Sequence, residues 1–350
     1  MKFSILLLAR QNNMKKIKFN LPLVNTHSHA AMVAFRGLAE GLPLNTWLNQ
    51  YIWPMEKERL NPQFIYQNTQ AAIKEMKANG IALFNDMYFF AEAIARAAEK
   101  MKMPAVIGEG IIDFPTPSAK TPQEALATTE KLLIQYKNHP LIKIAVAPHS
   151  IYTVSAENLI RAKELADQYK TIYHIHCAET KKEFDDCLAQ NKLTPVAYLD
   201  KLGVLDGKTL LAHCVWLTDE DIEILAKRRT NVAHCPLSNL KLGSGVAPVA
   251  KMLAQGIIVA LGTDGAASSN RLDVWEAGKF AVLLQKGINL DPTKISAKQA
   301  VAMMTVNGLR ALGYESFHGK PLSYWQERLD QGGNYNYLYE AQSRDLDYKI

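Results

Sequence analysis

The stretch Leu21–Gly37, LPLVNTHSHAAMVAFRG, places two histidines directly after a short apolar run. Residues 21–24 have the composition of a buried β-strand. Side chains two residues apart on a strand point to the same face, so we expect His27 and His29 to face one way at the strand end. Neutral imidazole is the commonest metal ligand in proteins. The pair is therefore either half of a tetrahedral metal site or two hydrogen-bonded histidines, and the rest of the chain must decide.

The composition describes a globular chain with a sizeable core. Of its 350 residues, 48% are hydrophobic and 21% are charged, which suits one large domain or two ordinary ones. The net charge of +6 is spread along the chain, without a basic run that contains aromatic residues. Nucleic acid is therefore not expected as a partner. A membrane is not expected either, because no apolar stretch approaches the roughly 20 residues of a membrane span.

The N-terminal run and the cysteines bear on the cellular compartment. Residues 3–9 are barely long enough for the core of a signal peptide, and no small-residue cleavage site follows them, so we expect a short strand or a ragged start. No Cys-x-x-Cys pair occurs. Three cysteines directly follow histidines and are expected to lie beneath covering helices as small apolar residues, which favours the reducing cytoplasm. The cysteines are Cys177, Cys187, Cys214 and Cys235.

Eight short apolar segments along the chain have the composition of β-strands. Helical periodicity fills the intervals between them, most clearly in residues 61–80, 155–170, 218–229 and 246–256. Buried strands that alternate with amphipathic helices are typical of a parallel sheet covered by helices. Eight such units over about 290 residues suit an α/β fold with a closed (β/α)8 barrel better than an open sheet. The predicted strands are residues 21–25, 80–86, 104–113, 141–148, 171–177, 209–214, 230–235 and 256–264.

Six of these eight segments end at, or close to, a histidine or aspartate that is a candidate site residue. Active sites of (β/α)8 barrels lie at this end of the strands. Packing alone does not account for so many polar side chains at one end of a barrel, so we expect a functional centre there. The residues are His27, His29, His149, His176, His213, His234 and Asp264.

Five motifs resemble those of the amidohydrolase superfamily in order and spacing. They are most similar to its branch of 5′-methylthioadenosine/S-adenosylhomocysteine deaminases, which lies near the triazine hydrolases and guanine deaminases. The resemblance covers residues 21–313. It implies a metal-dependent hydrolase barrel that removes the amino group of an adenine nucleoside to give the inosine analogue and ammonia. The motifs are NTHSH (25–29), IHCAET (175–180), LAHCVWL (211–217), HCPLSNLKLGSG (234–245) and LGTDGAASSN (261–270).

The resemblance implies one divalent metal ion per chain, with zinc as the first choice and iron as the second. Its ligands would be His27, His29, His176 and Asp264. The binuclear branch would carry a lysine at the end of the fourth strand, where this chain reads APHS. Neutral imidazole ligands leave most of the charge of the cation in place, so the pKa of a bound water would fall toward neutrality.

The same resemblance implies three catalytic roles. Glu179 would touch the substrate and carry a proton from the water to a ring nitrogen, and His213 would hold the attacking hydroxide. Asp264 would take the remaining proton and deliver it to the leaving ammonia. Taken alone, Glu179 is more typical of a surface carboxylate that caps the next helix. The other zinc-deaminase fold requires His-x-Glu and Pro-Cys-x-x-Cys motifs, which this sequence does not contain.

For the substrate, the resemblance implies that Glu56 accepts hydrogen bonds from two ribose hydroxyls and that Trp47 lines the same pocket. A carboxylate suits a vicinal diol because each oxygen can accept one O–H. His149 would contact N3 of the purine. Without the resemblance, Trp47 is more typical of a core aromatic and Glu56 of a solvated helix residue. Two histidines are left: His234 is either a residue behind the ligands or a structural one, and His174, one layer deeper than His176, is interpreted as packing.

Two departures from the family pattern shape the domain and substrate predictions. The chain has few residues before its first histidine motif, and residues 314–350 lack the closing strand segment of the family. We therefore expect a short segment over residues 1–20, the barrel over 21–313 and an atypical tail over 314–350. The accessory β-sandwich of the family would be largely missing, and the apolar surface left exposed would reduce solubility.

The second departure concerns arginine. Related enzymes hold the carboxylate of S-adenosylhomocysteine with arginines between the third and fourth strands, but only Arg59 and Arg96 lie between Glu56 and His149 here. We therefore prefer 5′-methylthioadenosine over S-adenosylhomocysteine or adenosine as the small-molecule partner. A homo-oligomer is compatible with this function. The alternatives are a guanine deaminase, a triazine-type chlorohydrolase, and a truncated remnant without turnover.

Overall fold

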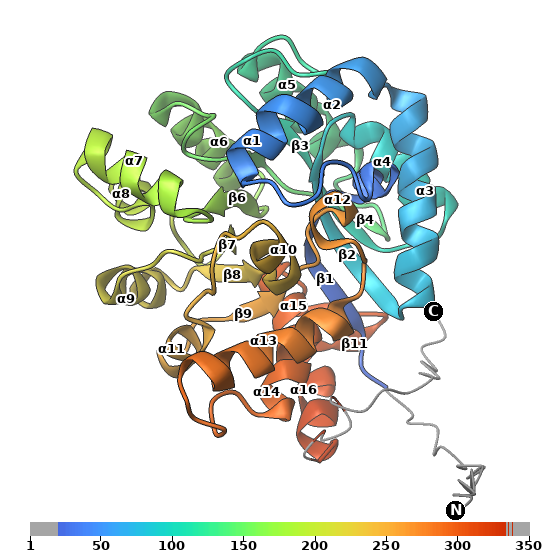
Figure 1. Cartoon of the computed structure of the whole chain (residues 1–350). Coiled ribbons are helices and arrows are strands. Elements are labelled where there is room, and N and C mark those ends of the chain that lie inside the picture. Colours follow the sequence, from blue (N-terminus) through green and yellow to red (C-terminus); the bar gives the residue numbers. More distant parts are fainter. Residues whose placement is uncertain (1–19, 334, 336–337, 339–350) are drawn as a thin grey trace, which may run out of the picture.

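The computed structural model describes residues 20–333 together with residues 335 and 338. Its centre is a (β/α)8 barrel of parallel strands surrounded by helices (Figure 1). Each of the eight predicted segments contains a strand, and the fourth is divided into β4 and β5, both of which pair with β3. The strands are β1 (Leu23–Ser28), β2 (Ile81–Tyr88), β3 (Ala105–Ile111), β4 (Ile142–Ile144), β5 (Ala147–Pro148), β6 (Tyr173–Cys177), β7 (Thr209–His213), β8 (Asn231–His234) and β9 (Val259–Leu261).

Two half-barrels, β1 to β5 and β6 to β9, join along two seams. At the first seam, parallel bridges connect Val146 to Tyr173 and Ser150 to His176. At the second seam, the backbone N–H of Asp264 donates to the carbonyl of His27 over 2.9 Å. The side chain of Asn25 adds two hydrogen bonds to Thr263, of 2.7 and 2.9 Å. The predicted closed barrel is therefore confirmed, and its second seam places the first and last motifs of the sequence side by side.

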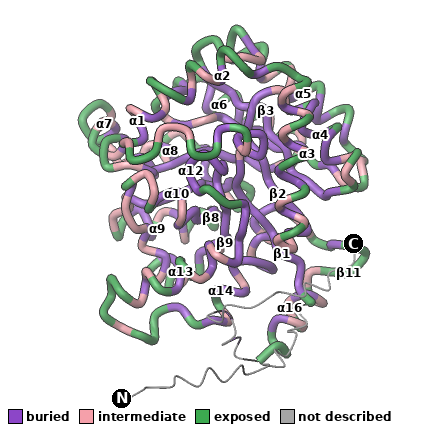
Figure 2. The backbone as a smooth tube through the Cα atoms, turned by 45° about the vertical axis from the view of Figure 1, so that its right-hand side comes forward, coloured by how far each residue is buried: buried purple, intermediate pink, exposed green. Residues whose placement is uncertain are grey.

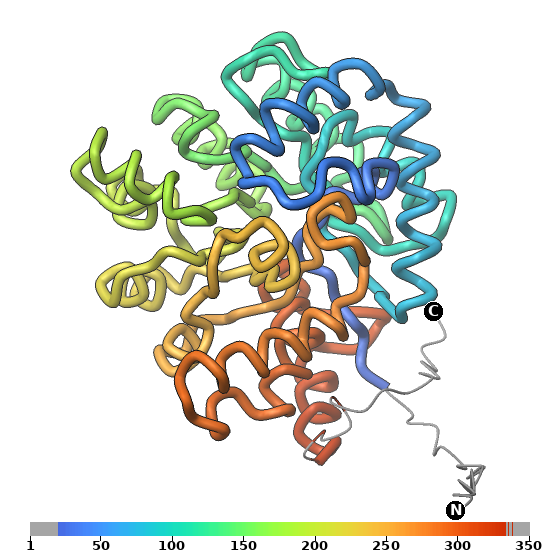
Figure 3. Tube along the Cα trace, in the orientation of Figure 1, coloured from blue at the N-terminus to red at the C-terminus, as the bar shows by residue number. Residues whose placement is uncertain are grey.

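Helices cover the outside of the barrel and also follow the strands at their C-terminal ends (Figure 3). All four predicted helical intervals contain a helix. Threonines begin several helices by accepting the N–H group three residues later, as Thr121, Thr180 and Thr218 do. The helices are η1 (Ala30–Phe35), α1 (Leu44–Trp47), η2 (Leu48–Ile52), α2 (Trp53–Arg59), α3 (Pro62–Ala78), α4 (Ala91–Lys100), α5 (Pro122–Gln135), α6 (Ala156–Gln168), α7 (Lys181–Asn191), α8 (Pro195–Lys201), α9 (Asp219–Arg228), α10 (Pro236–Lys241), α11 (Val249–Ala254), α12 (Ala266–Ser269), α13 (Val274–Ile288), α14 (Ala297–Met304) and α15 (Val306–Ala311).

The hydrophobic core lies between the strands and the inner faces of these helices (Figure 2). Nearly every strand residue is buried, including the polar ones at the strand ends. All four cysteines are free and buried, as expected for small apolar residues. In the described part of the chain, none of the helices combines the length and apolarity needed to cross a bilayer.

The segment after the barrel is partly described. Residues 316–321 form a small antiparallel hairpin of β10 (Ser316–Phe317) and β11 (Lys320–Pro321), and α16 (Leu322–Gln331) follows. Trp325 and Leu329 of α16 are four residues apart and both join the core, which gives this helix an apolar face that the sequence pattern did not lead us to expect. Within the described residues there is no β-sandwich. Residues 1–19, and with them the expected N-terminal segment, lie outside the described residues.

Gly308 of α15 generates a test of how closely the helices pack on β1. A Cβ atom at this position would lie 2.6 Å from Cβ of Val24, whereas one at Gly287 of α13 would meet no atom within 4 Å. We expect Gly308→Ala to lower the free energy of unfolding by about 1–3 kcal/mol through overpacking. Gly287→Ala, the matched control, should raise it by up to about 1 kcal/mol because alanine favours helix. Urea denaturation measures both, and equal effects would contradict the close packing.

Candidate active site

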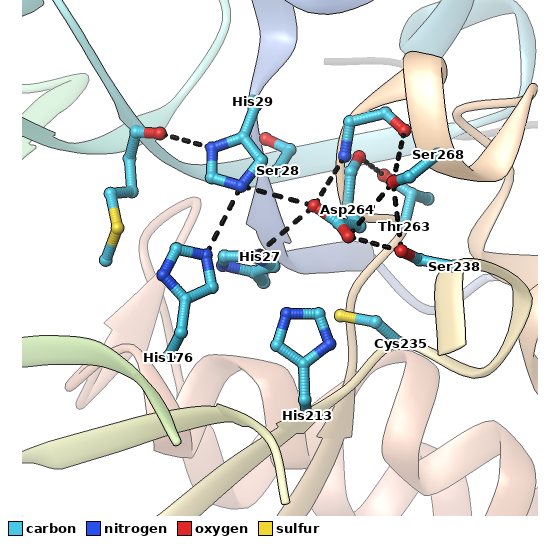
Figure 4. Close-up of polar contacts among 12 residues, drawn as sticks. His27, Ser28, His29, His176, His213, Cys235, Ser238, Thr263, Asp264 and Ser268 are labelled. Carbon is cyan, nitrogen blue, oxygen red and sulfur yellow. Dashed lines mark hydrogen bonds and ion pairs between the residues drawn. The ribbon is translucent and has the colours of Figure 1, made fainter. Parts of the chain in front are cut away.

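Four imidazoles and one carboxylate meet at the C-terminal end of the barrel (Figure 4). His27 lies on β1, His29 directly follows it, and Asp264 follows β9; His176 lies on β6 and His213 ends β7. Their nitrogen and oxygen atoms form two overlapping groups, His27–His176–His213 and His27–His29–Asp264, each within 4.8 Å. The structure therefore brings together the four predicted metal ligands and His213.

The spacing of these atoms fits one divalent cation. Oδ1 of Asp264 lies 3.2 Å from Nε2 of His29 and 3.5 Å from Nε2 of His27, and Nε2 of His176 lies 3.3 Å from Nε2 of His29. Ligands of tetrahedral zinc stand roughly 3.4 Å from one another when the metal–nitrogen distance is 2.0–2.1 Å. In addition, Nε2 of His27 is buried and has no hydrogen-bond partner among the described residues. A bound cation would satisfy this buried nitrogen.

Each of the four imidazoles has a partner for its other ring nitrogen. Metal-binding histidines are usually oriented in this way, because a hydrogen bond at Nδ1 leaves Nε2 aimed at the metal. Two partners are backbone carbonyls, one on β2 and one directly after β5, and two are side chains that were not selected from the sequence. The pairs are His27 with Nε2 of His174 (3.0 Å), His29 with the carbonyl of Met87 (2.5 Å), His176 with the carbonyl of His149 (2.7 Å) and His213 with Oδ1 of Asn239 (2.8 Å).

His174 corrects one of our predictions. It is fully buried, and its ring lies within hydrogen-bond distance of both His27 and Nδ2 of Asn85, each over 3.0 Å. The interpretation of His174 as packing is therefore wrong, because the residue orients a predicted metal ligand. The alternation of β6 carried this signal, since His174 and His176 share one face of the strand.

Asp264 is fixed by several hydrogen bonds and by an uncommon backbone conformation. Its Oδ2 accepts from the hydroxyls of Ser238 (2.5 Å) and Ser268 (3.1 Å), and its φ of +62° lies in the left-handed region. Burial would raise the pKa of Asp264, but His27 and His29 hold it well below its usual range. Burial lowers the pKa of His29 as well, yet Asp264 outweighs it and raises the value to about 9. Burial lowers the pKa of His27 to about 4.

Glu179 is a buried residue of the site, not a surface carboxylate. Its side chain is next to His213, with 3.7 Å between Oε2 and Nε2, and burial raises its pKa. Glu183 at the start of α7 accepts the backbone N–H groups of Ala178 and Glu179, both over 2.8 Å. Glu183 thus satisfies the N–H groups before the helix, and the carboxylate of Glu179 is left to face the centre.

A pocket opens from this centre to solvent. Trp47, Glu56 and His149 line it together with Glu179, as the sequence predicts, and Tyr88 and Tyr152 add two phenols that the sequence analysis missed. Its other walls are mostly apolar, and among the described residues no lysine or arginine lines it. Arg59 and Arg96 lie elsewhere: Arg59 contacts Glu58, and Arg96 lies over the ring of Tyr66 at 5.8 Å.

Glu56 of α2 is held inside this pocket. Its carboxylate is 5% exposed and accepts a hydrogen bond from the hydroxyl of Tyr88 over 2.5 Å, so it is not a solvated helix residue. Burial raises the pKa of Glu56 to about 7, although the Tyr88 hydrogen bond and the charge of His29 lower it. Trp47 is likewise buried on the pocket wall, where its Nε1 donates to the carbonyl of Leu38 over 3.2 Å.

The two remaining histidines differ in position. His149 lines the pocket, and its Nδ1 lies 3.0 Å from the hydroxyl of Ser150 and 2.9 Å from that of Thr153. Burial lowers its pKa to about 3, so the ring is neutral. His234 is buried behind the site: it does not line the pocket, and neither ring nitrogen has a partner among the described residues.

Comparison with known proteins agrees with the fold and the motifs. A 5-methylthioadenosine/S-adenosylhomocysteine deaminase of Thermodesulfovibrio yellowstonii is 49% identical over 292 residues, which are 83% of this chain and 66% of the relative. A 5′-deoxyadenosine deaminase of Methanothermobacter thermautotrophicus is 45% identical over 84% of this chain and 69% of its own length. The chain thus spans about two thirds of the length of these curated relatives.

A solved structure is also similar. The crystal structure of an adenosine deaminase from Xanthomonas campestris with bound zinc superposes with a TM-score of 0.82 at 39% identity. The match covers 84% of this chain and 67% of that one. A family model matches residues 22–319, a range that contains every barrel strand and every residue of the centre, and this chain is a member of the amidohydrolase family.

Proposed function

We propose that the protein removes the amino group of an adenine nucleoside by hydrolysis, with 5′-methylthioadenosine as the preferred substrate. The products are the inosine analogue and ammonia. One observation carries the proposal: the cluster of metal-ligand side chains and the buried carboxylate of Glu56 face the same pocket. The names of the relatives, which are deaminases of adenine nucleosides, support it.

In this proposal His27, His29, His176 and Asp264 hold one divalent cation, and zinc is the first choice because the similar adenosine deaminase binds it. When bound, the cation lowers the pKa of a water molecule and supplies a nucleophile at neutral pH. The carbonyl of Met87 and the ring of His174 keep the imidazoles in place.

The side chains around the cation divide the proton transfers between them. Glu179, buried and with a raised pKa, takes one proton from the water and gives it to the ring nitrogen beside the reacting carbon, while the water oxygen bonds to that carbon. His213, 3.7 Å from Glu179, hydrogen-bonds the attacking oxygen. The ionised carboxylate of Asp264 accepts the second proton and passes it to the amino group, which leaves as ammonia.

The pocket wall selects the nucleoside. Glu56 accepts the two ribose hydroxyls, Trp47 packs beside them and the neutral ring of His149 contacts the purine. Because no lysine or arginine lines the pocket among the described residues, the carboxylate of S-adenosylhomocysteine would find no bidentate partner. Guanine and triazines have no ribose hydroxyls to donate to the buried carboxylate of Glu56. A nucleoside is therefore favoured over them as the substrate.

The compartment and the extent of the domain complete the proposal. Four free, buried cysteines suit the reducing cytoplasm. The barrel over residues 21–313 would be the catalytic unit, with the hairpin and α16 packed against it.

A panel of adenine nucleosides, followed by loss of the adenine absorption band, tests the proposed activity. We expect 5′-methylthioadenosine to have the highest kcat/KM, followed by S-adenosylhomocysteine or adenosine. Guanine as the best substrate would overturn the assignment. A purified chain that holds far less than one metal ion and turns over nothing would be the inactive remnant instead.

Glu179→Gln tests the proton transfer. The side chain at position 179 is not a proposed metal ligand, and the amide preserves its size. Metal content and substrate binding should therefore persist while kcat falls by about 10²–10⁴.

His176→Ala should instead lose the metal ion, measured by elemental analysis, whereas His139→Ala, far from the centre, should retain it. If Glu179→Gln stays within about threefold of wild type, another group moves the proton, and Asp264 is the next candidate.

Glu56→Ala tests ribose recognition. Loss of a buried, charged hydrogen-bond acceptor worth roughly 1.5–3 kcal/mol should raise KM for nucleosides by about tenfold or more. Glu58→Ala removes a carboxylate from the exposed face of the same helix and serves as the control, with KM unchanged. Steady-state kinetics decide the matter, and an unchanged KM in Glu56→Ala would rule out the ribose-binding role.

A further inference from the structure

The carboxylate of Glu56 depends on one partner. Among the described residues it accepts a single hydrogen bond, from the hydroxyl of Tyr88 over 2.5 Å, and both side chains are 5% exposed. Among the residues that the structure describes, no lysine or arginine lines the pocket around the pair. The Tyr88 hydroxyl is therefore the protein group that compensates Glu56 for the loss of water.

The two residues come from different kinds of element, a short helix and a barrel strand. Glu56 lies on the short helix α2, which follows the π-helical turn η2, and a glutamate side chain has several rotamers that must be restricted before it can bind. Tyr88 ends β2, where it pairs with Glu109 of β3. Its ring packs at 5.3 Å from the ring of Phe89 and at 5.9 Å from that of His29. The barrel thus fixes Tyr88, and Tyr88 can fix Glu56.

The contact also leaves room for a diol. An ionised carboxylate has about four lone-pair sites, and the Tyr88 hydroxyl occupies one of them. The remaining sites are enough for two ribose hydroxyls. The hydrogen bond at Oε1 therefore orients the carboxylate and leaves it able to accept the ribose hydroxyls.

We propose that Tyr88 is a positioning residue for the sugar: its hydroxyl holds Glu56 in the rotamer that accepts both ribose hydroxyls, and so sets the preference for ribonucleosides over deoxyribonucleosides. This inference rests on the proposed function. It separates binding from chemistry, because the preceding residue, Met87, contacts His29 through its backbone carbonyl, which substitution of the Tyr88 side chain leaves in place.

The experiment compares adenosine, 2′-deoxyadenosine and 3′-deoxyadenosine as substrates of wild type, Tyr88→Phe, Glu56→Ala and the double variant. Tyr88→Phe should raise KM for adenosine by about tenfold or more, as expected for loss of a buried charged hydrogen bond. Its kcat and metal content should remain near those of wild type, and the preference for adenosine over both deoxynucleosides should shrink by the same factor. In the Glu56→Ala background, Tyr88→Phe should change KM by less than about twofold, because no carboxylate is left to position.

A matched control is available on the outside of the barrel. The Tyr169 hydroxyl donates to Oε1 of Glu130 over 3.0 Å, so Tyr169→Phe removes the same type of hydrogen bond away from the pocket. Its KM should equal that of wild type. If Tyr88→Phe does not fold, as judged by thermal unfolding, Glu56→Asp replaces it: the shorter side chain keeps the charge but withdraws it from Tyr88, and should show the same rise in KM and loss of sugar preference.

Several outcomes would overturn the inference. They are an unchanged KM in Tyr88→Phe or in Glu56→Asp, effects of Tyr88→Phe and Glu56→Ala that multiply, and loss of metal or of kcat in Tyr88→Phe. The last result would assign Tyr88 to the metal centre. If wild type prefers adenosine and Tyr88→Phe has the same kinetics, this inference alone is rejected. If wild type is inactive toward all adenine nucleosides, the proposed function is rejected and the inference with it.

Discussion

The seam between β9 and β1 is the constraint on which the rest of the structure depends. The N–H of Asp264 must reach the carbonyl of His27, and the side chain of Asn25 must reach Thr263, which is 238 residues away in the sequence. Only a barrel that closes with the correct stagger of its strands satisfies both contacts. When the barrel closes in this way, the carboxylate of Asp264 lies within 3.5 Å of both His27 and His29. The first and last motifs of the sequence are thus one structural unit.

Such a centre is costly to assemble. It combines buried imidazoles, a carboxylate and the left-handed backbone of His213 and Asp264, each of which is unfavourable by itself. The surrounding polar groups offset the cost: Ser238 and Ser268 bond to Asp264, and Asn239 bonds to His213. This explains why the strand ends of the barrel are polar and buried at once, a combination that a packing role alone would not favour.

The sequence predicted what depends on local pattern. Alternation along strands and their spacing gave the barrel, and the motif at residues 25–29 gave the first two candidate ligands. Contacts between side chains far apart in the sequence were harder to predict. Tyr88 stands in the run MYFF, which is typical of a core strand, and nothing near it indicates a carboxylate 32 residues earlier. His174 was interpreted as packing, because strand alternation showed the face on which it lies but not its partner His27, 147 residues away. The helix α16 was missed because its apolar face consists of few residues.

Two consecutive residues at the end of β2 each orient a side chain of the site. The carbonyl of Met87 holds His29, and the hydroxyl of Tyr88 holds Glu56. In the proposed function, this one strand therefore sets the separation between the reacting end and the sugar end of the pocket, while Glu56, the proposed sugar acceptor, lies on a helix outside the barrel. Exchange of the segment over residues 44–59 is thus expected to change which sugar or side group is accepted and to leave the proposed metal ligands in place. In the proposed function the groups for the chemistry lie at the strand ends of the barrel, whereas part of the recognition lies on the segment between β1 and β2, so that evolution can change this part of recognition separately from the chemistry.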